Sequence, residues 1–129
     1  MEAVVGSCTW VERGAERYLR LVTGRSDGSG LIALTRDLHR LVVAEPPGPV
    51  RVLVDAREQP FVLDARLMTE SKRLHVDALR EHTLRIVIIG RHPAGTRLVA
   101  GMNFISGRTT VLAARDEEHA WRLLLAAGT

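Results

Sequence analysis

The stretch LRIVIIG, residues 84–90, decides the fold of this chain. Its central run from Ile86 to Ile89 is apolar at every position, so the strand that it predicts must be covered on both faces. A second run, VRVLVDA at 50–56, is equally rich in β-branched and apolar residues and predicts another strand. We expect these two strands to lie side by side and to run parallel, with helices on each side of the sheet.

Weaker strand patterns lie at both ends of the chain. MEAVVGSCTWVERG and RYLRLVTG flank Gly14-Ala15-Glu16 and predict a hairpin, and TTVLAA at 109–114 predicts a final strand. The hairpin should place the first strand antiparallel at one edge of the sheet.

Helical periodicity fills the segments between the strands. The first helix is capped by Ser29 or Asp27, and its buried stripe is Leu31, Leu34, Leu38, Leu41 and Val42. Asp64 can cap a second helix, and a weaker third helix begins near Pro93. The last helix lies in RDEEHAWRLLLAAG, with Asp116 at its cap.

The resulting order is ββαβαβαβα. It predicts one α/β domain over residues 1–129, with a mixed, mostly parallel five-stranded sheet and about four helices. The residues that we expect to be mostly buried are Val52, Val54, Ile86, Val87, Ile88 and Trp121.

Composition and charge exclude several classes of protein. The net charge is +3, but basic and acidic residues alternate and only 4% of residues are aromatic, so we expect no nucleic-acid binding. Cys8 is the single cysteine, which excludes an internal disulfide and favours a reducing, cytoplasmic setting. No apolar run is long enough for a signal peptide or a membrane span.

The order of elements also carries a resemblance. The leading hairpin, VRVLVDA, LRIVIIG, TTVLAA and the closing DEEHAWRLL together resemble the SpoIIAA-like branch of the STAS fold, whose small bacterial members are similar to anti-sigma-factor antagonists. The resemblance implies a non-catalytic cytoplasmic regulatory module that binds a protein partner or a small ligand. Regulatory STAS domains carry a phosphorylatable serine where the helix after VRVLVDA begins. Here the first hydroxyl after Asp55 belongs to Thr69, so we expect no serine switch.

Asp55 ends the VRVLVDA strand, at the edge of the sheet where parallel α/β proteins bind ligands. A phospho-accepting aspartate of the receiver type would need further acids after the first strand, a Ser or Thr after LRIVIIG and a Lys after the last strand. Thr9, Gly90-Arg91-His92 and Arg115-Asp116 stand in those places, so the receiver interpretation fails. We favour a structural Asp55 that accepts hydrogen bonds from the backbone of its own loop, and a pairing with Arg57 is compatible with that role.

Four arginines, Arg25, Arg57, Arg91 and Arg115, each follow a predicted strand. If they converge, they form an anion site for a carboxylate or phosphate, and Asp55 or Glu58 could then serve as acid or base in a ligand-transfer domain or small enzyme. The alternative is that each arginine is paired with a protein acid. We expect pairing, because arginines are scattered through the whole chain.

Other sites have weaker support. The five histidines match neither HExxH nor any other ligand spacing, so we predict no metal and no cofactor. An exposed edge of the hairpin leaves a homo-oligomer open. Three hypotheses therefore remain: an interaction module that binds a protein or small anionic ligand, which we favour; an enzyme or transfer domain; and a structural oligomer.

Overall fold

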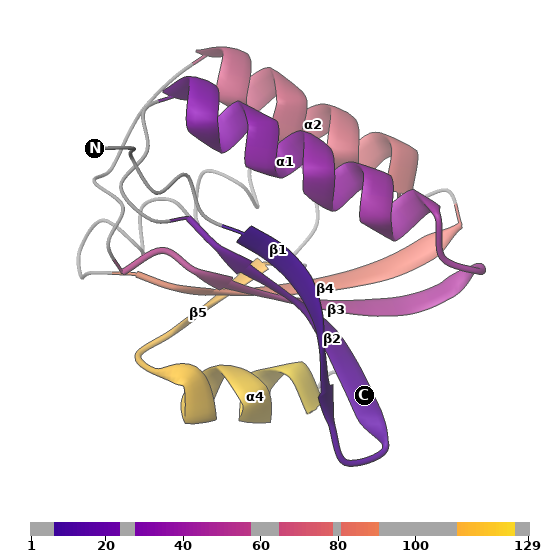
Figure 1. Cartoon of the computed structure of the whole chain (residues 1–129), viewed down its shortest axis with the longest axis vertical. Coiled ribbons are helices and arrows are strands. Elements are labelled where there is room, and N and C mark those ends of the chain that lie inside the picture. Colours follow the sequence, from indigo (N-terminus) through magenta and orange to yellow (C-terminus); the bar gives the residue numbers. More distant parts are fainter. Residues whose placement is uncertain (1–6, 24–27, 58–64, 79–80, 91–110, 126–129) are drawn as a thin grey trace.

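The computed structural model describes residues 7–23, 28–57, 65–78, 81–90 and 111–125 (Figure 1). The elements are β1 (Ser7–Arg13), β2 (Glu16–Val22), α1 (Gly28–Val43), β3 (Gly48–Asp55), α2 (Ala65–Ala78), β4 (His82–Ile89), β5 (Val111–Ala114) and α4 (Glu117–Leu125). The strands form one sheet in the order β1-β2-β3-β4-β5. β1 is antiparallel to β2, and every other neighbouring pair is parallel.

The architecture confirms the α/β class, the mostly parallel sheet and the antiparallel hairpin at its edge. β3 and β4 are adjacent and parallel, with Val50 opposite Leu84, as predicted. The expected count of about four helices is not matched, since the described residues form three. The helix predicted from Pro93 lies outside those residues. α1 begins at Gly28, so Ser29 is inside its first turn rather than at its cap.

Helices cover both faces of the sheet (Figure 1). α1 and α2 lie together on one face and α4 lies on the other. Because side chains of a strand alternate between faces, each central strand contributes to two clusters. The α1 side holds Leu19, Leu21, Val50, Val52, Ile86 and Ile88 with Leu34, Leu38 and Val42 of α1. The α4 side holds Tyr18, Leu53, Val87 and Ile89 with Ala120, Trp121 and Leu124 of α4.

The burial pattern follows the sequence prediction. Val52, Ile86, Val87, Ile88 and Trp121 are buried. Val54 is partly buried and packs against the α1-side cluster. No helix in the described part of the chain is long and apolar enough to cross a membrane.

The β1–β2 hairpin contacts both helical layers through its arginines. The Arg17 guanidinium lies 4.0 Å from the centre of the Trp10 ring and pairs with Glu45, which follows α1. On the opposite face, Arg13 lies 4.9 Å from the Trp121 ring of α4 and its Nη2 is 2.8 Å from Glu118 Oε1. The ion pair of Arg17 with Glu45 connects the hairpin to the α1 side, and the contacts of Arg13 with Trp121 and Glu118 connect it to α4.

The turn of this hairpin depends on one glycine. Arg13 and Glu16 are paired, so Gly14 and Ala15 form a two-residue loop, and only Gly14 has a positive φ, of 63°. A positive φ at the first central position alone is the pattern of a type II′ turn, which matches the twist of the strands.

Gly14→Ala should therefore lower the free energy of unfolding by about 1 to 2 kcal/mol, the usual cost of holding a side-chain-bearing residue at positive φ. Space is not the cause, since a Cβ at this position would meet no atom within 4 Å. Urea denaturation measures the difference. Ala15→Ser is the matched control and should be nearly neutral; an unchanged midpoint for Gly14→Ala would contradict the turn assignment.

Candidate functional site

Asp55 ends β3 with its carboxylate held by two arginines. Oδ1 accepts hydrogen bonds from the Arg57 backbone N–H at 3.2 Å and from Arg57 Nε at 3.0 Å. Oδ2 accepts from Arg57 Nη2 at 2.8 Å and from Arg20 Nη2 at 3.3 Å. The Asp55 side chain is only 12% exposed. Arg57 thus closes the loop after β3 with a fork-shaped pair that reaches back two residues.

The alternation of the sheet explains how Arg20 reaches this carboxylate. Arg20 lies opposite Leu53 in the parallel β2–β3 register, and Asp55 lies opposite Val22. Leu53 belongs to the α4-side cluster. Arg20 lies directly opposite Leu53, and Asp55 lies two residues after it in the same strand, so both side chains also face α4. There Arg20 Nε donates to Glu117 Oε1 at 3.1 Å, and Arg57 Nη2 lies 3.8 Å from the same oxygen.

We call Arg20, Asp55, Arg57 and Glu117 the ionic cluster. Its two guanidinium groups and two carboxylates carry no net charge, and they join β2, β3 and the first turn of α4. The side-chain hydrogen bonds from Arg57 hold the pKa of Asp55 below its usual range, although burial opposes them. Asp55 is therefore ionised near neutral pH and poorly suited to take up a proton as a general base.

Arg115 and Asp116 organise the start of α4. Asp116 Oδ1 accepts the His119 N–H at 2.8 Å, the bond expected of an N-cap. This bond lowers the pKa of Asp116. In return His119 Nδ1 accepts the Arg115 N–H at 3.2 Å, while Arg115 Nε lies 3.9 Å from Asp116 Oδ2. These residues position α4, and through it Glu117.

The structure brings together only part of the predicted edge. Asp55 and Arg57 are in direct contact, and Arg115 is paired with Asp116 instead. Arg25, Glu58 and Arg91 lie outside the described residues. Sequence reasoning missed Arg20 as a member, although its place in the alternating pattern of RYLRLVTG was a signal. Glu117, in the acidic first turn of α4, was missed as well.

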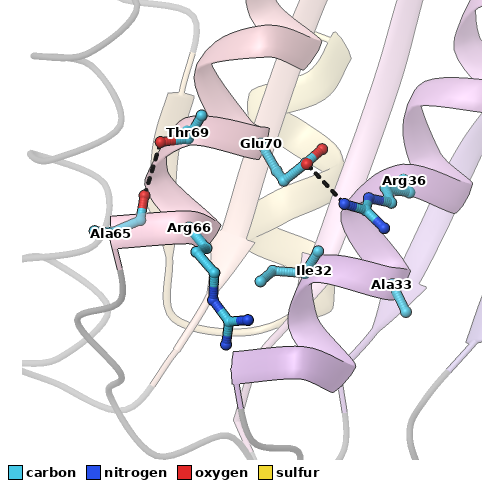
Figure 2. Close-up of a pocket in the computed structure, with 7 residues that line it drawn as sticks. All are labelled: Ile32, Ala33, Arg36, Ala65, Arg66, Thr69 and Glu70. Carbon is cyan, nitrogen blue, oxygen red and sulfur yellow. Dashed lines mark hydrogen bonds and ion pairs between the residues drawn. The ribbon is translucent and has the colours of Figure 1, made fainter.

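A groove lies on the other face of the sheet, between α1 and α2 (Figure 2). Its volume is about 450 Å³, and its lining residues are Ile32, Ala33, Arg36, Ala65, Arg66, Thr69 and Glu70. Arg36 Nη2 lies 3.0 Å from Glu70 Oε1, which joins the two helices across the groove. Ile32 and Arg66 extend into the space between the helices (Figure 2).

The two helices run in the same direction along this groove. His39 Nε2 lies 3.6 Å from Asp77 Oδ2, further along both helices than the Arg36–Glu70 pair. The groove therefore lies toward the N-terminal ends of α1 and α2. Among the residues that the structure describes, no group of three or more His, Cys, Asp or Glu side chains is placed to hold a metal ion.

No family model matches the chain, and no curated protein matches its sequence. Among solved structures, the chain is similar to an uncharacterized protein from the DUF3478 family of Shewanella loihica PV-4, whose crystal structure has a SpoIIAA-like fold. The TM-score is 0.69 at 16% sequence identity, over 96% of this chain and 98% of the other. The chain has the SpoIIAA-like fold.

That result confirms the resemblance in the sequence and concerns the fold alone. Within the SpoIIAA-like frame, the ionic cluster occupies the end of β3 and the groove lies between the two helices of the opposite face. The comparison assigns no role to either place.

Asp55→Asn should destabilise the protein by about 1 to 3 kcal/mol at neutral pH, because it weakens hydrogen bonds between charged groups and leaves two arginines poorly paired. A depressed folded-state pKa gives stability that is present above the unfolded value near 3.9 and is lost as the pH falls through the folded value. The difference from wild type should therefore shrink below about pH 4. Urea titrations across pH measure it. Asp37→Asn, at an exposed pair with Arg40, is the control and should change stability little.

Phosphate and sulfate should leave the melting temperature of the wild-type protein unchanged, because the guanidinium groups of Arg20 and Arg57 already bind carboxylates. In Asp55→Asn these groups lose a charged partner, so the same anions should raise the midpoint of that variant. A bound anion at 100 times its dissociation constant would add about 2.7 kcal/mol, a shift of several degrees. A shift of that size in the wild type would show an anion site at this edge.

Proposed function

We propose that this chain is a non-catalytic, cytoplasmic regulatory or interaction module, which binds a protein partner or a small ligand without a serine switch. The observation that carries the proposal is the closed charge balance of the ionic cluster. At the strand ends where α/β enzymes keep their reactive groups, Asp55 is paired with Arg20 and Arg57, and its pKa is lowered. A working acid or base would need a pKa moved toward neutrality instead.

We assign binding to the groove between α1 and α2. It combines a small apolar surface, from Ile32, Ala33 and Ala65, with charged groups at Arg36 and Glu70. Apolar lining with a few polar groups that fix orientation is the usual character of a recognition surface. The groove is open, and it faces away from the ionic cluster, so binding there requires no change in the contacts that hold α4.

We propose no phosphorylation switch at the start of α2, because no side-chain hydroxyl is present there to accept a phosphate. α2 begins at Ala65, and no Ser or Thr stands between Asp55 and Thr69. Thr69 Oγ1 donates to the Ala65 carbonyl at 2.9 Å, so this hydroxyl is engaged with the helix backbone. Binding would then be regulated by the amount of partner or ligand, not by a charge added to the helix start.

An affinity pull-down from the native host with mass spectrometry tests this proposal. Wild-type protein should capture a specific partner, and Ala33→Arg should abolish the capture because the new side chain fills the exposed groove. Ala44→Arg is the matched control: it adds the same side chain at an exposed position just after α1 and should leave capture intact. A small ligand would show as a thermal shift in wild type and Ala44→Arg only.

Capture that is equal in all three proteins would overturn the assignment to the groove. Turnover of a metabolite by wild-type protein, lost in Asp55→Asn while that variant remains folded, would instead establish the enzyme hypothesis. Circular dichroism of each variant verifies folding before the comparison.

A further inference from the structure

β1 is an edge strand of the described sheet. It pairs with β2 on one side, and no described strand lies on its other side. The outer edge of such a strand presents unpaired backbone N–H and C=O groups, which can extend the sheet by pairing with another strand. Its location, on a different part of the molecule from the groove, makes this edge an independent surface.

The two-residue turn determines which backbone groups point outward. In an antiparallel hairpin of this kind, the pair that closes the loop is hydrogen-bonded, and hydrogen-bonded pairs then alternate along the strands. Arg13 and Glu16 close the loop, so Arg13, Val11, Thr9 and Ser7 direct their backbone groups to β2. The N–H and C=O groups of Cys8, Trp10 and Glu12 consequently point away from the sheet.

In the described part of the chain, the β1 strand lacks three usual forms of protection against pairing. Proteins commonly block an edge with a proline, a bulge or a charge in the middle of the strand. The sequence SCTWVER contains no proline, and its seven residues pair one to one with β2 without a bulge. Its charged residues, Glu12 and Arg13, both lie at the end next to the turn.

We propose that the β1 edge pairs antiparallel with β1 of a second copy of this chain and so forms a symmetric dimer with a continuous sheet across the interface. The twofold axis passes through the paired Trp10 residues, perpendicular to the sheet. This register uses the whole strand, with Cys8 opposite Glu12 and Ser7 opposite Arg13 of the other copy. About six backbone hydrogen bonds then form between Cys8, Trp10 and Glu12 of the two copies.

Charge selects this register over its neighbours. An axis through Glu12 or Arg13 would set like charges directly opposite each other, which destabilises a sheet. An axis through Val11 avoids that conflict but pairs only residues 9–13. The register centred on Trp10 alone pairs all seven residues and places each charged residue opposite a neutral one.

Side chains on α1 give the same face a second form of self-complementarity. Burial and, to a smaller extent, Asp37 raise the pKa of Cys8 to about 11, and Arg40 opposes them, so both charged groups of α1 lie near β1. Asp37 Oδ1 is 3.6 Å from Arg40 Nη2, and both side chains are exposed. The twofold axis keeps α1 of both copies on one face of the joined sheet. Each copy then offers one acid and one base to the other, in opposite order.

Sedimentation of two variants tests the dimer. Glu12→Pro removes only an outward N–H, because that backbone group does not bond to β2, so the variant should fold and be monomeric. Glu12→Ala removes the same side chain, keeps the N–H and should remain dimeric like the wild type. The proposal is overturned if the wild-type protein sediments as a monomer at micromolar concentration, or if folded Glu12→Pro is as dimeric as Glu12→Ala.

Disulfide trapping tests the register and does not depend on the proline variant. In a Cys8→Ser background, Ser7→Cys protein is mixed with Arg13→Cys protein and oxidised. The two positions face each other in a non-hydrogen-bonded pair, about 4.5 Å apart at Cα, which suits a disulfide. Either variant alone should not form a cross-link, since two Ser7 positions are about 20 Å apart along the strand. Cross-links within one variant, or none in the mixture, would overturn the register.

Discussion

Burial on both faces of β3 and β4 is the constraint on which the other elements depend. Val52 and Leu53 are adjacent in sequence and point to opposite faces, and both are almost fully buried, as are Ile86 and Val87. Each such side chain contributes about 1.5 to 3 kcal/mol only if the face to which it points is covered. α1 and α2 cover one face of the sheet (Figure 1). The other face is covered by α4, which follows β5 at the end of the described chain. Neither layer is sufficient alone.

The ionic cluster is a consequence of that arrangement. β3 ends at Asp55, where the apolar alternation stops and the first turn of α4 approaches. A carboxylate that is 12% exposed at this point requires partners, and Arg20 and Arg57 supply them. The cluster therefore fixes where α4 begins relative to β2 and β3. The groove on the opposite face is lined by other residues and takes no part in these contacts.

The central strands were predictable because their evidence is local. Ile86 to Ile89 are apolar at every position, and only a doubly covered strand satisfies that pattern. The Asp55–Arg57 pair was also accessible, since its members are two residues apart. Arg20 and Glu117 were not, because their approach to Asp55 depends on the β2–β3 register and on the placement of α4. The groove likewise arises from two helices, and no stretch of sequence contains it.

Two of the arginines of the hairpin, Arg13 and Arg17, also determine what an optical experiment would report. The chain has two tryptophans, and each lies against a guanidinium group from this hairpin: Trp10 against Arg17 on the α1 side, and Trp121 against Arg13 on the α4 side. Intrinsic fluorescence of this protein is therefore a signal from the hairpin and its two contacts. A Trp→Phe change at either position would leave a probe for one helical layer alone, so the order in which the two layers separate from the sheet during unfolding can be followed without any added label.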